Sequence, residues 1–208
     1  MESLDIIVVG GGLSGLTAAV VAHEAGARVL VLEAGGEIGG RIQCVTDQAT
    51  GRAIADLGPT WVWPSYQPVV LRWLQRLGIE TFPQFNDGDG VLDGWSREVE
   101  RLPMPEQDGI RRIPGGPSTL VFALARRLPA PILRVRETVV SVGEGHGGAL
   151  GVALASGERL FASRVILATP LRVTAHQIAL PDIDPDLRRA LERTPTWMAT
   201  QAKVVAVY

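Results

Sequence analysis

The 208-residue sequence almost lacks several residue types, and each shortage excludes a class of protein. The single cysteine, Cys44, cannot form an internal disulfide, and the three scattered histidines do not have the spacing of zinc ligands. Lysine is nearly missing, because Lys203 is the only one among 20 basic residues, and the formal net charge is −2. This balance argues against a nucleic acid or an anionic membrane as the main partner. We therefore expect no metal site and a small-molecule ligand.

The sequence also lacks a long hydrophobic run. Residues 6–22 are uncharged, but a run of three glycines interrupts them, and acidic residues precede them where a signal peptide is basic. We therefore expect neither a secretory leader nor a membrane span, and the lone cysteine suits a reducing, cytoplasmic location. The composition, with 46% hydrophobic and 20% charged residues, is typical of a globular protein.

The beginning of the chain predicts a βαβ unit. Residues 4–12 (LDIIVVGGG) are typical of a short buried strand that runs into a glycine turn. Residues 13–26 predict a helix that Gly26 ends, and residues 27–34 (ARVLVLEA) predict a second, parallel strand.

The rest of the chain mixes helices, strands and a loop-rich stretch. Proline, glycine and aspartate accumulate over residues 83–116, which predicts a loop-rich connection or a small inserted element and a candidate domain boundary. Strands are expected at 131–135 and 138–142, in a β-meander from 151 to a strand buried on both faces at 165–168, and at 202–208. Further helices are expected at 67–78 and 118–128.

The strongest motif is a G-x-G-x-x-G pattern made by Gly10, Gly12 and Gly15. It stands between the first strand and the first helix, and Glu33 ends the next strand 18 residues after it. This context predicts a dinucleotide site, in which the pyrophosphate lies on the helix N-terminus beside Leu13 and Ser14, and Glu33 binds the adenosine ribose. Glu33 also disfavours a 2′-phosphate and hence NADP.

Two other interpretations of the motif remain possible. A glycine-rich turn can bind nothing. Ser14 could be a hydrolase nucleophile, but that motif requires a glycine where Leu16 stands, and no histidine is placed as its base.

Residues 33–42 (EAGGEIGGRI) resemble the flavin-containing amine oxidoreductase family, in which an acidic residue is followed by Gly-Gly-Arg. The resemblance implies FAD as the cofactor, with Glu33 and Ala34 at the ribose end and Gly40 and Arg41 near the pyrophosphate. The sequence departs from the family at Gly35, where an arginine is common.

The resemblance continues at three later segments. Residues 55–64 (ADLGPTWVWP) resemble a loop that runs close to the flavin, and the matching residues are Gly58, Pro59, Thr60 and Trp61. Val139 matches a position whose backbone touches the adenine, and Ala168 and Thr169 match the turn that closes over the cofactor. Packing without a role in binding is the alternative for Trp61, Val139 and Ala168.

Lys203 matches the lysine that holds a water against the flavin N5 in enzymes of the monoamine oxidase type. The alternative is a strand-end lysine that extends into solvent. The resemblance implies an enzyme that oxidises a C–N bond by hydride transfer to FAD, with reoxidation by oxygen and an amine as substrate. An FAD-dependent desaturase or protoporphyrinogen oxidase-like enzyme, or a non-catalytic nucleotide-binding fragment, remains open.

The expected fold is α/β, with a Rossmann-like FAD-binding domain of glutathione reductase-like topology and a partial, interleaved substrate domain. We assign residues 1–80 and 113–172 to the FAD-binding domain, and residues 81–112 and 173–208 to the substrate domain. The resemblance stops before the family's remaining substrate-facing segments, so we expect the chain to be a truncated part.

Overall fold

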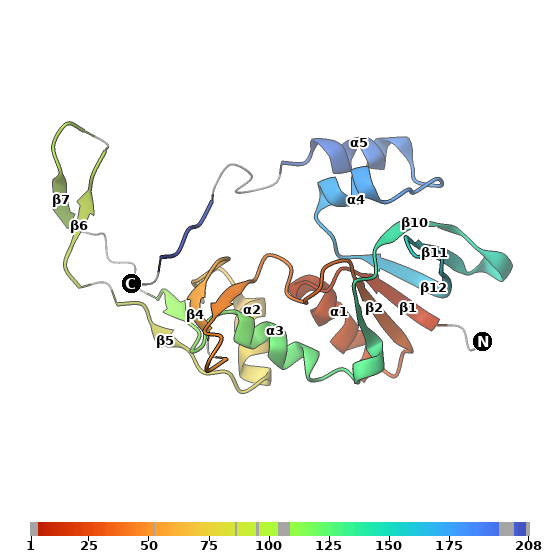
Figure 1. Cartoon of the computed structure of the whole chain (residues 1–208), viewed down its shortest axis with the longest axis horizontal. Helices are drawn as coiled ribbons and strands as arrows, with labels where there is room; N and C mark the ends of the chain where they lie inside the picture. Colours follow the sequence, from red (N-terminus) through yellow and green to blue (C-terminus); the bar gives the residue numbers. More distant parts are fainter. Residues whose placement is uncertain are drawn as a thin grey trace.

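The structure is a computed structural model that describes residues 4–51, 53–85, 87–94, 96–103, 109–195 and 202–206. Its largest sheet has six strands in the order β10-β11-β12-β1-β2-β9 and lies at one end of the molecule (Figure 1). Four strands run parallel: β12 (Arg159–Leu167), β1 (Leu4–Val9), β2 (Val29–Glu33) and β9 (Leu133–Val135). The expected α/β class with a Rossmann-like parallel sheet is confirmed.

The predicted βαβ unit is confirmed as β1, α1 (Leu13–Glu24) and β2. Gly26 follows the helix at φ +86°, a left-handed conformation that glycine adopts without steric cost, and this ends the helix where the sequence predicts. The parallel register aligns Val9 with Leu32, so both strands end at the same edge of the sheet.

The two faces of the sheet carry separate parts of the core. Val8 and Val31 pack with α1 and with α3 (Ser118–Ala125), whereas the alternate residues Ile7 and Leu32 pack with the β-meander on the other face. Successive side chains of a strand point to opposite faces, so β1 and β2 are buried on both sides and need continuous apolar sequence.

The predicted β-meander is formed by β10 (Val139–Glu144), β11 (Leu150–Leu154) and β12. β10 pairs with β11, and β11 pairs with β12, both antiparallel. A short 3-10 turn, His146–Gly148, forms the tip of the hairpin between β10 and β11. The expectation that residues 165–168 are buried on both faces is wrong, because Val165 and Ile166 are half-buried and Leu167 is 36% exposed. The strand contacts both core clusters, but the elements on either side cover its end only in part.

The sequence analysis did not predict α4 (Leu171–Gln177) and α5 (Pro185–Arg193), which lie beside the meander (Figure 1). The Asp184 side chain caps α5 by accepting hydrogen bonds from the backbone N–H groups of Asp186 and Leu187. Backbone hydrogen bonds between Ala179 and β10 fasten this region to the sheet.

The remaining elements form the other end of the molecule, where α2 (Pro68–Arg76) confirms the predicted helix. The stretch expected to be loop-rich contains two strand pairs: β5 (Phe82–Pro83) with β8 (Arg111–Arg112), and β6 (Asp89–Leu92) with β7 (Glu100–Pro103). The β6–β7 hairpin projects away from the rest of the chain (Figure 1), and residues 104–108 lie outside the described residues. A further pair, β3 (Cys44–Thr46) with β4 (Ala53–Asp56), and the 3-10 turn Ala130–Ile132 complete the structure.

The strand expected over residues 202–208 is not present in residues 202–206, which are exposed and have no paired neighbour in the described chain. A strand needs a partner for its backbone N–H and C=O groups, and an apolar sequence does not supply one. Residues 207–208 lie outside the described residues. None of the described helices is long and apolar enough to cross a membrane.

Candidate cofactor site

The glycine turn after β1 has a different steric constraint at each motif position. Gly10 has φ +108°, and a Cβ there would lie 3.0 Å from the carbonyl oxygen of Ala168. A Cβ on Gly15 would collide with the carbonyl oxygen of Gly10, so the helix packs on the strand at a distance that only glycine permits. A Cβ on Gly12 would meet nothing closer than 3.9 Å, which leaves open space above this backbone.

The N-terminus of α1 faces this open space. Gly12 is the N-cap residue, no described side chain caps the helix, and the first turn has no acidic residue. The first backbone N–H groups of a helix have no partner inside it, and together with the helix dipole they favour an anion. Leu13 is half-buried and Ser14 is exposed, as a turn that contacts a ligand requires.

Glu33 ties the second strand to the glycine turn. Its Oε2 accepts a hydrogen bond from the Gly11 N–H and its Oε1 accepts one from the Gly35 N–H, both at 2.7 Å. A carboxylate has about four acceptor positions, so these bonds orient Glu33 and leave capacity for two hydroxyls. Ala34, the next residue, is exposed.

The loop of residues 39–41 returns to the same turn. The Gly39 N–H donates to the Gly11 carbonyl at 2.8 Å, and Gly39 also forms a β-bridge with Gly12. Gly40 has φ +59°, and its Cα lies next to Gly12. Arg41 follows directly and is exposed.

The loop of residues 58–61 packs directly behind Arg41. A Cβ on Gly58 would collide with the Arg41 carbonyl oxygen, so this contact also requires a glycine. Pro59 is exposed and Thr60 is half-buried. The Lys203 Nζ donates to the Gly58 carbonyl oxygen at 2.7 Å and to the Thr60 Oγ1 at 2.9 Å. The structure therefore brings Lys203 to the predicted loop although the predicted strand is not formed.

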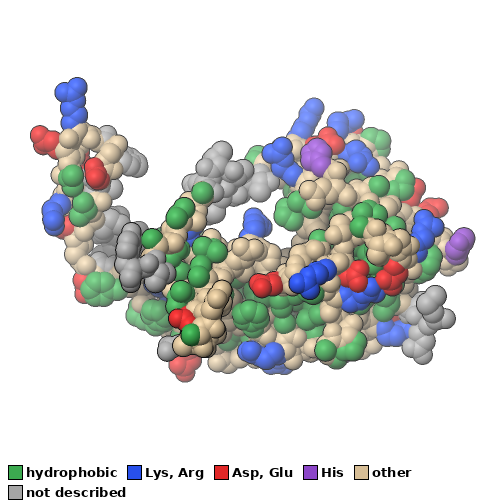
Figure 2. Space-filling view, viewed as in Figure 1, with side chains coloured by type: hydrophobic (Ala, Val, Ile, Leu, Met, Phe, Trp, Pro, Cys, Tyr) green, Lys and Arg blue, Asp and Glu red, His purple; other side chains and the backbone are tan. Residues whose placement is uncertain are grey.

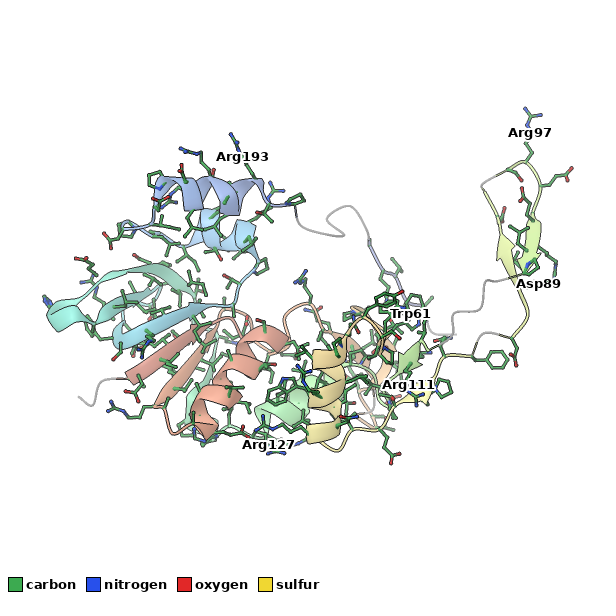
Figure 3. The ribbon with its side chains drawn as sticks, turned by 180° about the vertical axis from the view of Figure 1, so that it is seen from behind. Trp61, Asp89, Arg97, Arg111, Arg127 and Arg193 are labelled. Atoms are coloured by element: carbon green, nitrogen blue, oxygen red, sulfur yellow. The ribbon has the colours of Figure 1, made fainter. Side chains whose placement is uncertain are left out.

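Trp61 has a polar partner and a ring partner. Its Nε1 donates to the Gln84 Oε1 at 3.1 Å, and its ring meets Trp63 edge-on with 5.7 Å between centroids. Trp61 lies near Arg111 (Figure 3), because Val62 and Arg111 exchange two backbone hydrogen bonds. The Trp61 side chain is still 45% exposed.

Hydrophobic side chains are exposed at this end of the molecule (Figure 2). Besides Trp61, they include Phe82, Phe85 and Val204, and Phe85 is 75% exposed. Apolar surface beside a polar site suits a hydrophobic molecule as the ligand of this region.

The remaining predicted residues lie at the edge of the same turn or behind it. The Ala168 N–H donates to the Val9 carbonyl at 2.8 Å, and Thr169 shares a 2.6 Å hydrogen bond with the buried Thr174. Val139 is buried in the core, where its side chain packs with the β-meander.

The residues present fit the adenosine diphosphate part of a dinucleotide. The uncapped helix start, the open space over Gly12 and the oriented Glu33 carboxylate all lie at the carboxyl ends of β1 and β2, where open α/β sheets bind ligands. No described group of three or more His, Cys, Asp or Glu could hold a metal ion.

Comparison with protein families gives two matches. Residues 8–77 match an NAD(P)-binding Rossmann-like domain, and residues 100–208, more than half of the chain, match the flavin containing amine oxidoreductase family. The chain belongs to the flavin-containing amine oxidoreductases. The resemblance inferred from residues 33–42 is therefore confirmed, and with it FAD as the cofactor that the family implies.

Individual relatives match only part of this flavin-containing amine oxidoreductase. Amine oxidase [flavin-containing] B from Sus scrofa is 44% identical over 78 residues, and the protein of that name from Homo sapiens is 42% identical. Each match covers 38% of this chain and 14% of the relative's length.

Solved structures show the same fold over more of the chain. Putrescine oxidase bound to putrescine superposes with a TM-score of 0.75 at 19% identity, covering 90% of this chain and 62% of that one. Cyclohexylamine oxidase from Brevibacterium oxydans gives a TM-score of 0.76 at 15% identity and covers 92% of this chain and 63% of that one. The chain thus spans less than two thirds of the length of these enzymes.

The sequence analysis missed the contribution of Arg136 and Glu137, which join the second strand to the meander. The Arg136 N–H donates to the Gly35 carbonyl at 2.8 Å, and the Glu137 N–H donates to the Glu33 carbonyl at 2.9 Å. Arg134 bonds both Glu137 and Glu158, and it lowers the pKa of the Glu158 carboxyl. No spacing in the sequence indicates the bonds of Arg136 to Gly35 and of Glu137 to Glu33, because the partners are about 100 residues apart.

Proposed function

We propose that the protein is an FAD-dependent oxidoreductase of the amine oxidase type, which oxidises the C–N bond of a small amine. When bound, FAD supplies the acceptor for the hydride that leaves the carbon next to the amine nitrogen, and oxygen regenerates the cofactor. The protein's own residues bind and orient the cofactor, hold the substrate and position the water that the reaction uses.

One observation carries the proposal, namely the convergence of the Glu33 carboxylate and an uncapped helix start on one glycine turn. Glu33 accepts two backbone hydrogen bonds of 2.7 Å, one of them from the turn itself. We propose that the pyrophosphate lies over Gly12, where no Cβ stands in the way, and that the adenosine ribose bonds to the free acceptor positions of Glu33.

The other predicted cofactor residues have proposed roles around this centre. Arg41 faces the pyrophosphate, for which a guanidinium fork is well suited. We propose that the Val139 backbone contacts the adenine and that Ala168 and Thr169 border the cofactor from the last parallel strand. In this proposal, residues 1–80 and 113–172 bind FAD, and residues 81–112 and 173–208 face the substrate.

Lys203 has the proposed catalytic role. Its ammonium group is held by one carbonyl and one hydroxyl of the loop of residues 58–60, which leaves one of its three N–H donors without a partner among the described residues. That donor is proposed to hold a water beside the reacting atoms, as the resemblance implies. Putrescine oxidase and cyclohexylamine oxidase, which share the fold, are named for amines, and this supports an amine as the substrate class.

The first test is the visible absorption spectrum of the purified protein, recorded before and after incubation with FAD and removal of free FAD by desalting. A retained flavin spectrum is the expected result, and a protein that stays colourless contradicts the proposal. A panel of primary, secondary and cyclic amines is then tested for peroxide formation by the FAD-loaded protein. Amine-dependent peroxide supports the reaction, and its absence with every amine argues for another flavin reaction.

A further inference from the structure

Arg136 has an unusual backbone conformation for its residue type. It is the only described residue other than glycine with a positive φ, at +59°. This left-handed backbone conformation is unfavourable for any residue that has a Cβ. Residues held in it are concentrated at ligand-binding positions. The conformation is fixed by the 2.8 Å hydrogen bond from the Arg136 N–H to the Gly35 carbonyl, next to the 2.9 Å bond between Glu137 and Glu33.

The Arg136 guanidinium lies next to Gly36. Its Nη2, Nε and Cζ atoms are 3.5, 3.7 and 3.8 Å from the position that a Cβ on Gly36 would take. All three distances are ordinary van der Waals contacts, so the guanidinium lies directly beside Gly36. Gly35 and Gly36 have no side chains that could cover the guanidinium.

The guanidinium also has no partner of opposite charge among the described residues. Arg134, two residues earlier, bonds both Glu137 and Glu158, so these two nearby carboxylates are already paired. Both oxygens of Glu33 accept backbone hydrogen bonds. An exposed arginine that is fixed at its backbone and unpaired at its charge is available to a ligand.

The position of the guanidinium indicates which part of a ligand it would meet. Glu33 bonds Gly11 with one oxygen and Gly35 with the other, so it lies between the helix start and the loop of residues 35–36. In a dinucleotide the ribose lies between pyrophosphate and adenine. A pyrophosphate over Gly12 and a ribose at Glu33 therefore direct the adenine toward Gly36 and Arg136.

We propose that the Arg136 guanidinium stacks on the adenine ring of FAD and determines much of the affinity for the adenosine end of the cofactor. The inference rests on the proposed function. A planar cation is attracted to the face of an aromatic ring, and arginine stacks on such faces where lysine offers only a point charge.

The test measures the dissociation constant of FAD for the protein and for four variants by titration of the flavin fluorescence. Arg136→Ala is expected to weaken binding about ten-fold, the size of a lost base-stacking contact. Arg126→Ala, which removes one exposed arginine after α3, is the matched control and leaves the affinity unchanged. Arg136→Lys keeps the positive charge but lacks the planar guanidinium. It is expected to bind FAD several-fold more weakly than the wild type.

Arg136→Gly separates a binding role from a structural role. Glycine adopts φ +59° without steric cost, so the melting temperature of this variant stays equal or rises while FAD affinity falls as in Arg136→Ala. The affinity for ADP, measured by competition, falls by the same factor, whereas inorganic pyrophosphate competes equally with wild type and variant.

The outcomes distinguish the two proposals. If the wild type does not bind FAD, the proposed function fails and this inference fails with it. If the wild type binds FAD and Arg136→Ala binds it equally well, only the inference is wrong. Full rescue by Arg136→Lys also overturns it, because a point charge is then sufficient and the contact is not a stacked one.

Discussion

The Lys203 Nζ donates a 2.7 Å hydrogen bond to the carbonyl oxygen of Gly58, which is 145 residues earlier in the chain. The same ammonium donates to the Thr60 Oγ1 at 2.9 Å. Gly58 in turn packs on the Arg41 carbonyl in a space too small for a Cβ. The only lysine of the sequence is therefore connected through one loop to the glycine turn that we propose binds FAD.

Lys203→Met is expected to slow flavin reduction or reoxidation at least about ten-fold while FAD stays bound, because the free N–H donor of Lys203 is lost. The measurement is stopped-flow absorbance of the FAD-loaded protein mixed with an amine and, separately, with oxygen. Lys203→Arg keeps a charged donor beside the Gly58 carbonyl and should recover part of the rate. Unchanged rates in Lys203→Met would remove this residue from the mechanism.

Gly15→Ala is expected to destabilise the protein by about 1–3 kcal/mol, because the new Cβ collides with the Gly10 carbonyl oxygen and separates α1 from β1. Urea denaturation measures the change. Gly12→Ala is the matched control, since Gly12 has φ −76° and no atom within 3.9 Å of a new Cβ. Its stability should change by less than about 0.5 kcal/mol. Equal destabilisation by both variants would contradict the packing argument.

Glu33→Gln is expected to weaken FAD binding roughly 10–100-fold, because an amide accepts hydrogen bonds less strongly than a carboxylate and turns a donor toward one of its present partners. Isothermal titration with FAD measures the affinity. Glu37→Gln, which neutralises an exposed carboxylate four residues later, is the control and leaves the affinity unchanged. An unchanged affinity in Glu33→Gln would show that the ribose is bound elsewhere.

The sequence predicts those helices and strands that are determined by residues close together in the chain. The βαβ unit follows from apolar strands, a glycine turn and the stop at Gly26, all within about 30 residues. The start of α5 also has a local signal, because Asp184 followed by Pro185 is typical of a helix N-terminus. The strands β6 and β7 were not predicted, because the glycine- and aspartate-rich composition around them is typical of loops.

Features that depend on distant partners could not be predicted. The apolar sequence around Val204 is typical of a strand, but only a neighbouring strand makes it one, and the described chain supplies none. The left-handed Arg136 is fixed by a bond to Gly35, and the position of Lys203 by bonds to residues 58 and 60. The composition and periodicity of the sequence do not predict these contacts, because their partners are far apart in the chain.

Asp5→Asn is expected to lower the melting temperature at neutral pH, because Asp5 joins the starts of β1 and β2. Its carboxylate accepts hydrogen bonds from the Arg28 guanidinium and from the Arg28 N–H, and these bonds hold the pKa of Asp5 below its ordinary value. A lowered pKa in the folded state means that the ionised form stabilises the fold above about pH 4, and that this stabilisation is lost as the pH falls through the lower, folded value. Melting curves of both proteins from pH 7 to pH 2 should therefore converge in acid, where Asp5 is protonated. A difference that stays constant over this range would mean that the charge of Asp5 does not stabilise the fold.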